Sequence, residues 1–216
     1  VMSLWALPLE QGSWTIMART NSFVNDIAEF LEQNRYFYSR KGRWSVSEKK
    51  LEAMSVWKDI SSGKGVYVSR VRKMYEMVPK TGEGAVVKRG SAKLLDAAGP
   101  DELLTYDKLV KEFGLLAPMS TDQTDIIRLS EEEKIYIRSV ERRGESIYKE
   151  PRIKISTIHA MKGGEDDNVA VYLGSTKACV EGKHPEDEDR IFYVAVTRAK
   201  QNLYLIESDK KYRYEI

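Results

Sequence analysis

The sequence predicts an α/β protein whose mostly parallel sheet is interrupted by an inserted helical block. Two stretches carry this prediction, one near each end of the chain. Between Ile153 and Glu207, apolar strand-like runs alternate with a polar, glycine-containing loop and one apolar helix. Between Trp14 and Leu31, a short apolar run leads into a helix. Alternating strands and helices favour a parallel sheet, whose carboxyl edge commonly meets charged ligands.

The first stretch predicts a buried strand at residues 14–18 and then an amphipathic helix capped by Thr20 or Asn21. A short strand is expected at residues 36–38. Ser45 and Glu48 have the spacing of a capping box for a second helix, which ends at residues 61–65. The apolar face of the first helix repeats at i, i+4, i+7 and i+8: Phe23, Ile27, Phe30 and Leu31.

Residues 66–150 keep helical spacing and show no convincing strand. A helix at about 105–113 ends at Gly114, and a capping box at Ser130 and Glu133 starts another. We therefore expect an all-helical insertion over residues 63–150. The sheet domain is expected to combine residues 1–62 and 151–216.

The composition excludes several kinds of protein. The 216 residues are 42% hydrophobic and 31% charged, with a net charge of +2. The single cysteine, Cys179, rules out an internal disulfide and fits a reducing, cytoplasmic location. No apolar run approaches the roughly 18 residues that span a bilayer, and one cysteine with two histidines gives no zinc spacing. The start at Val1 fits an excised piece, a processed protein or a tag scar.

Two longer patterns lie in the C-terminal stretch. Residues 157–165 read Thr-x-His-x-x-Lys-Gly-x-Glu, and residues 193–199 read Tyr-Val-x-x-Thr-Arg-Ala. Together they resemble motifs V and VI of superfamily-1 helicases of the UvrD/Rep type. Residues 19–21, Arg-Thr-Asn at the end of the first strand, resemble motif IV. The resemblance implies a RecA-like second core domain, with residues 63–150 as a reduced form of the family's 2B insertion.

The resemblance also implies an ATP site. Arg198 would reach across a cleft to the γ-phosphate of ATP held by another domain, and Arg19 would act from the opposite side. A planar guanidinium stabilises the negative charge that develops on the phosphoryl oxygens during hydrolysis. Glu165, with Gly163 and Gly164, would help to bind the nucleotide. Relatives usually carry an apolar residue, commonly Leu, where this chain has Gly164.

Other residues of the same motifs would contact single-stranded DNA. Thr157 and His159 would lie under the strand, where a hydroxyl can bond phosphate and an imidazole can stack on a base. Lys162 would pair with phosphate. Simpler interpretations stay open: Arg198 could pair with Glu188, and Arg19, Lys162 and His159 could be ordinary surface or structural residues.

The chain contains no phosphate-binding loop of the form Gly-x-x-x-x-Gly-Lys-(Ser/Thr). We therefore expect ATP hydrolysis to require the N-terminal RecA-like domain of the same parent protein, which would also hold most of the Mg²⁺ ligands. Three alternatives remain: a motor within a helicase-nuclease, a non-enzymatic binding module that keeps the fold, and RNA in place of DNA.

Overall fold

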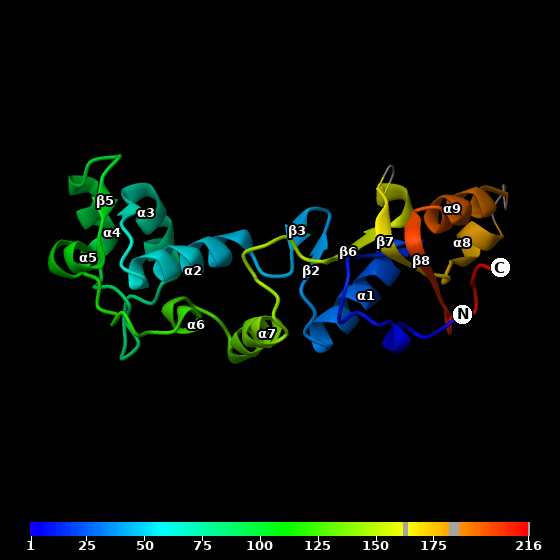
Figure 1. The fold of residues 1–216 in the computed structure, drawn as a ribbon, viewed down its shortest axis with the longest axis horizontal. Coiled ribbons are helices and arrows are strands. Elements are labelled where there is room, and N and C mark those ends of the chain that lie inside the picture. The colour runs from blue at the N-terminus through cyan, green and yellow to red at the C-terminus, as the bar shows by residue number, and fades with distance from the viewer. Residues whose placement is uncertain (162–163, 182–185, 216) are drawn as a thin grey trace. The chain divides into compact units, whose positions relative to one another are not determined.

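The computed structural model describes residues 1–161, 164–181 and 186–215. The chain forms two compact units (Figure 1). The sheet unit combines Val1–Ser45 with Glu150–Ile216, and the helical unit is Val46–Lys149.

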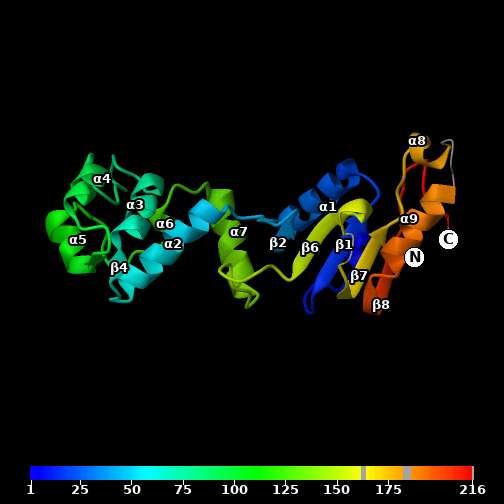
Figure 2. The ribbon, with the colours of Figure 1, turned by 90° about the horizontal axis from the view of Figure 1, so that it is seen from above.

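The sheet unit is built on a six-stranded sheet in the order β3-β2-β6-β1-β7-β8. Figure 2 shows β6, β1, β7 and β8 side by side. Every neighbouring pair is parallel except the antiparallel β2–β3 hairpin. The predicted α/β, mostly parallel fold is therefore confirmed. The strands are β1 Trp14–Ala18, β2 Tyr38–Arg40, β3 Arg43–Trp44, β6 Ile153–Thr157, β7 Asp166–Tyr172 and β8 Ala199–Ile206.

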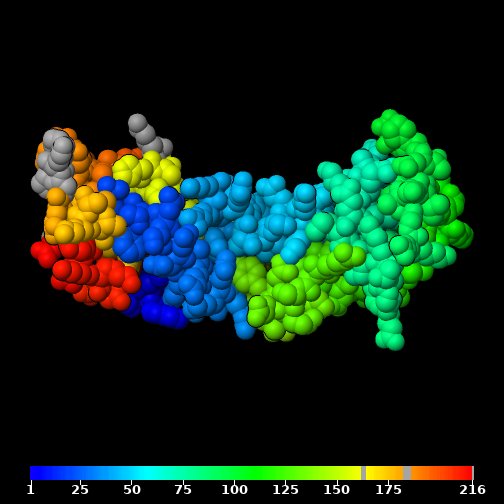
Figure 3. All heavy atoms as spheres, turned by 180° about the vertical axis from the view of Figure 1, so that it is seen from behind, coloured from blue at the N-terminus to red at the C-terminus, as the bar shows by residue number. Residues whose placement is uncertain are grey.

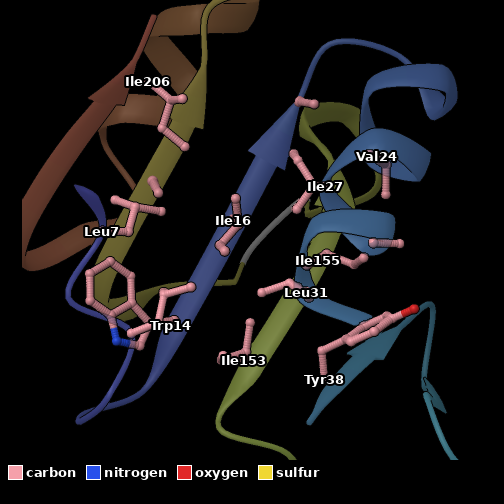
Figure 4. Packing of buried hydrophobic residues seen from close by; sticks show 14 of the residues in the cluster. Leu7, Trp14, Ile16, Val24, Ile27, Leu31, Tyr38, Ile153, Ile155 and Ile206 are labelled. Atoms are coloured by element: carbon pink, nitrogen blue, oxygen red, sulfur yellow. The ribbon is translucent and has the colours of Figure 1, made fainter. Parts of the chain in front are cut away.

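Strand β1 is buried on both faces, and all five of its residues are inaccessible to solvent. Side chains alternate across a strand, so Ile16 and Met17 belong to different hydrophobic clusters. Ile16 packs under α1 (Asn21–Gln33), against Ile27, Leu31 and Ile155 (Figure 4). Met17 packs in the cluster formed with the short 3₁₀ helix η3 (Ile158–Met161) and with α9 (Glu186–Val196).

The two chain termini add backbone pairing to this unit. The Met2 N–H donates to the Leu205 carbonyl at 2.9 Å, and the Glu207 N–H donates back to Met2 at 2.8 Å. Figure 3 shows the last residues, in red, beside the first residues, in dark blue. The Tyr214 N–H also donates to the Leu173 carbonyl at 2.8 Å, which holds the C-terminal segment beside the end of β7. Shorter helices are η1 Leu4–Ala6 and α8 Lys177–Val180.

The helical unit packs α2 against α3 around large buried side chains. Trp57 donates its indole N–H to the Thr121 carbonyl at 2.8 Å, and Tyr75 donates its hydroxyl to the Phe113 carbonyl at 3.1 Å. No helix in the described part of the chain is long and apolar enough to cross a membrane. The helices are α2 Glu48–Ser61, α3 Val68–Met77, α4 Ser91–Leu94, η2 Leu95–Ala97, α5 Tyr106–Glu112, α6 Gln123–Ile126 and α7 Glu131–Arg142.

The structure corrects the expectation of an all-helical insertion. Strands β4 (Val66–Tyr67) and β5 (Leu103–Leu104) pair antiparallel within the helical unit. Each strand has only two residues, too few to show a period-2 pattern, so the sequence could not reveal them. The sheet unit also ends at Ser45, and residues 46–62 belong to the helical unit because α2 packs there against α3.

The helix caps predicted from the sequence agree with the structure only in part. The predicted capping box at Ser130 and Glu133 is present at the start of α7. At α2 the cap is Ser47, whose hydroxyl accepts from the Lys50 N–H, and not Ser45 as expected. Thr20 is the N-cap of α1, but its side chain forms no capping hydrogen bond. The strand expected at residues 36–38 is β2, which begins two residues later.

Two of the N-caps in the helical unit, Ser130 and Thr105, test these local capping signals. Replacing Ser130 with Ala removes a cap hydrogen bond at 3.1 Å and should lower the free energy of unfolding by about 1 kcal/mol. Thr105 caps α5 without a side-chain bond, so Thr105→Ala should cost less than about 0.5 kcal/mol. Urea denaturation followed by circular dichroism measures both values, and equal losses would contradict the capping geometry.

Candidate functional site

The motif residues lie at two opposite edges of the parallel sheet. Arg19 follows the carboxyl end of β1, and Thr157 ends β6 at the same edge. Glu165 and Arg198 immediately precede β7 and β8, so they lie at the amino edge. Helix α9 runs between the two edges, and its last residue, Val196, lies two positions before Arg198.

Arg19 forms an ion pair with Glu188, near the start of α9. Its Nε donates to Glu188 Oε1 at 2.8 Å and lies 3.1 Å from Oε2, while Nη2 lies 2.7 Å from Oε1. The Arg19 side chain is 17% exposed and that of Glu188 is 8% exposed. Ser175 donates its hydroxyl to Glu188 Oε2 at 3.2 Å. The Glu188 carboxylate is therefore bound by Arg19, which follows β1, and by Ser175, which follows β7.

The position of Arg19 beside the start of α1 explains why a counter-ion is needed. The partial positive charge at a helix N-terminus disfavours a cation there, and Glu188 supplies the compensating negative charge. The hydrogen bond to Glu188 raises the pKa of Arg19, against the lowering effect of burial. Within the described part of the chain, the buried Thr20 hydroxyl has no hydrogen-bond partner, and it does not cap α1. The first turn of α1 is thus left without a side-chain acceptor from its N-cap.

Arg198 lies just beyond the C-terminus of α9 and is partly exposed. Its Nε donates to the Val194 carbonyl at 3.0 Å. Its own carbonyl accepts from the Asp166 N–H at 3.1 Å, which joins the end of α9 to the first residue of β7. Glu188, the acid weighed from the sequence as a partner for Arg198, is bound by Arg19 instead.

Glu165 is exposed and adjoins this junction between Arg198 and β7. Gly164 donates its N–H to the Met161 carbonyl at 3.2 Å. A Cβ added at Gly164 would lie 2.8 Å from Met161 Cε, so the larger residue common in relatives would require that flexible methyl group to shift. Gly163 and Lys162, both named from the sequence, lie outside the described residues.

Thr157 and His159 lie at the carboxyl edge of β6. The Ala160 N–H donates to Thr157 Oγ1 at 3.4 Å, and Ile158 is buried in the cluster under α9. These contacts hold η3 against the sheet. His159 is exposed on this turn, where its imidazole is accessible to a ligand.

Asp166 is a buried carboxylate that the sequence pattern did not single out. It accepts hydrogen bonds from the Ser13 hydroxyl, from Thr15 Oγ1 at 3.0 Å and from the Asp167 N–H at 2.9 Å. Asp166 is the first residue of β7, although the polar residues 166–168 show no apolar strand pattern in the sequence. Glu188 was missed as an Arg19 partner because the two residues are 169 positions apart. Their pairing depends on tertiary contacts.

A metal site is not evident at either edge. Among residues 1–161, 164–181 and 186–215, no group of three or more His, Cys, Asp or Glu side chains is arranged to hold a metal ion.

We expect the buried hydrogen bonds of Asp166 to stabilise the amino edge of the sheet. Asp166→Ala leaves the Ser13 and Thr15 hydroxyls without their acceptor, and we expect the free energy of unfolding to fall by about 2 kcal/mol. Asp167→Ala is the matched control and should change stability by less than about 0.5 kcal/mol. Thermal and urea unfolding of both variants provide the comparison. Equal effects would show that the buried hydrogen bonds of Asp166 contribute little.

A match to a known protein family covers most of the chain. The family model described as UvrD-like helicase C-terminal domain matches residues 22–210. The matched region contains η3, α9, Glu188 and Arg198, and it begins three residues after Arg19. The comparison with curated proteins finds no match. The sequence motifs, the mostly parallel six-stranded sheet and the extent of this match show that the chain belongs to the UvrD-like helicase C-terminal domain family.

Proposed function

We propose that this chain is the C-terminal half of an ATP-dependent DNA helicase or translocase motor, in which it supplies arginine fingers and a surface for single-stranded DNA. Membership of the family supports a helicase motor-domain role. The observation that carries the finer proposal is helix α9, which is ion-paired to Arg19 at one end and leads into Arg198 at the other.

The two arginines suit a reaction that transfers a phosphoryl group. Hydrolysis of ATP spreads negative charge over the phosphoryl oxygens, and a guanidinium stabilises that charge through paired hydrogen bonds. Arg198 uses only Nε for its contact with Val194 among the described residues, so both terminal nitrogens remain available to an anion. Glu165, exposed beside the same junction, would bind the nucleotide together with Gly163 and Gly164.

The rest of the ATP site would come from another domain. The 216 residues contain no phosphate-binding loop, and the described residues contain no metal-ligand cluster. We assign the phosphate cradle and most of the Mg²⁺ ligands to the N-terminal RecA-like domain of the parent protein. This chain alone should therefore fail to hydrolyse ATP.

The carboxyl edge of β6 would contact the DNA strand. His159 is exposed on η3, and within the described residues the Thr157 hydroxyl forms one long hydrogen bond, at 3.4 Å, from the Ala160 N–H. Lys162 follows in the same motif. Since η3 and α9 share one hydrophobic cluster, a movement of α9 during ATP-driven domain closure would also move η3. This contact would couple the nucleotide state to the affinity for the DNA strand.

The first test is steady-state ATPase activity of the parent protein with and without single-stranded DNA. Arg198→Ala should lower the DNA-stimulated kcat by about 10³-fold or more, because it removes a transition-state contact. Arg190→Ala is the control on the same helix: it is exposed and pairs only with Asp187, at 3.1 Å, among the described residues. It should stay within about twofold of the unmodified protein.

Two outcomes would contradict the proposal. Turnover by this chain alone that survives Arg198→Ala would show that the missing phosphate-binding loop and the role of Arg198 have been misinterpreted. If neither the chain nor its parent hydrolyses ATP, a non-enzymatic binding module becomes the better interpretation. A nuclease domain elsewhere in the parent would leave the motor proposal intact.

The second test concerns DNA. His159→Ala should raise the Kd of the parent protein for a labelled oligodeoxythymidylate by about tenfold, through loss of base stacking. Thr157→Val keeps the side-chain shape and should produce a smaller increase. Gln201→Ala, exposed on β8, serves as the control. Fluorescence anisotropy at fixed salt measures each Kd, and unchanged binding in both motif variants would show that Thr157 and His159 do not contact the DNA.

A further inference from the structure

We propose that Glu188 is a positioning residue that fixes the guanidinium of Arg19 for its contact with the nucleotide and couples it to α9. This inference rests on the proposed function, because it requires Arg19 to meet an anion from outside the chain. Glu188 itself would touch neither ATP nor DNA. Its role would be to determine where Arg19 points.

The geometry of the ion pair leaves one side of the guanidinium open. Glu188 Oε1 is shared by Nε, at 2.8 Å, and Nη2, at 2.7 Å. Nη1 has no partner among the described residues, and the Arg19 side chain keeps 17% of its surface exposed. A carboxylate that binds the Nε side orients the plane of the guanidinium while leaving N–H donors for a second anion.

The burial of Glu188 argues that the carboxylate is a fixed element. Its side chain is only 8% exposed, and a carboxylate taken out of water must be paired and hydrogen-bonded. Arg19 supplies the charge, and Ser175 supplies a further hydrogen bond at 3.2 Å. With both oxygens engaged, Glu188 has few alternative orientations, so Arg19 also has a defined one.

Helix α9 links this pair to the second arginine. Glu188 lies in the first turn of α9, and Arg198 follows its last residue, Val196. Eight residues at 1.5 Å each place Val196 about 12 Å along the axis from Glu188. Phe192 and Ala195 bury the helix against the sheet, so it moves as one body. A shift of α9 would therefore reposition Arg19 through Glu188 and Arg198 directly.

A double-mutant cycle in the full parent protein tests the proposal, with DNA-stimulated kcat and KM for ATP as readouts. Arg19→Ala should lower kcat by about 100-fold or more. Glu188→Gln should lower kcat by about 10-fold to 100-fold, because the arginine is still present but no longer held. KM should change less than about threefold, since the lost interaction belongs to the transition state. Asp187→Asn makes the same charge change on the exposed side of α9 and should have little effect.

The combined variant separates positioning from a general structural role. If Glu188 acts through Arg19, then Glu188→Gln added to Arg19→Ala should lower kcat by no more than about a further twofold. Additive losses, or a kcat of Glu188→Gln equal to that of the unmodified protein, would overturn the inference. Glu188→Asp, which retains the charge on a shorter side chain, should recover part of the activity lost in Glu188→Gln.

Two controls keep the result interpretable. Thermal unfolding of each variant identifies any loss of folded protein, and Glu188→Asp replaces Glu188→Gln in the cycle if the latter does not fold. Failure of the underlying function has a different signature: Arg19→Ala and Arg198→Ala would both leave ATP hydrolysis unchanged. A strong Arg19→Ala effect with an independent Glu188→Gln effect would overturn only the positioning role.

Discussion

The sheet unit depends on the burial of β1 between two parallel neighbours. β1 pairs with β6 on one side and β7 on the other, so Trp14 aligns with both Ile153 and Asn168. Parallel neighbours cannot be joined by a tight hairpin, and every connection must cross a face of the sheet. Helix α1 covers one face, while η3 and α9 cover the other. The motif segments are therefore also the segments that close the hydrophobic core.

This dual role explains why exposed motif residues and buried core residues alternate within a few positions. In η3, Ile158 is buried and the next residue, His159, is exposed. In α9, Phe192 is buried and Tyr193 is 69% exposed. Each buried neighbour holds an exposed side chain on a rigid backbone, which is the arrangement needed to present groups to a ligand at a defined position. Substitutions at Ile158 or Phe192 would therefore disturb both packing and presentation.

The Arg19–Glu188 pair adds a polar link to this apolar framework. Arg19 follows β1, and Glu188 belongs to α9 on the face opposite α1. Asp166 plays a comparable role at the other edge, where it ties β7 to Ser13 and Thr15. Both carboxylates are largely buried, and both join segments more than 150 residues apart. Polar contacts of this kind specify one register of the elements, whereas apolar packing tolerates several.

The sequence by itself determined the fold class, the long strands and helices, the Ser130 capping box and the motif residues, because periodicity and short motifs are local properties. Tertiary structure alone decided the Arg19–Glu188 pair, the role of Asp166 and the boundary at Ser45. It also decided β4 and β5, which are two residues each and show no period of their own. Each of these features depends on groups distant in sequence that meet only after the chain folds, so no local pattern could encode them.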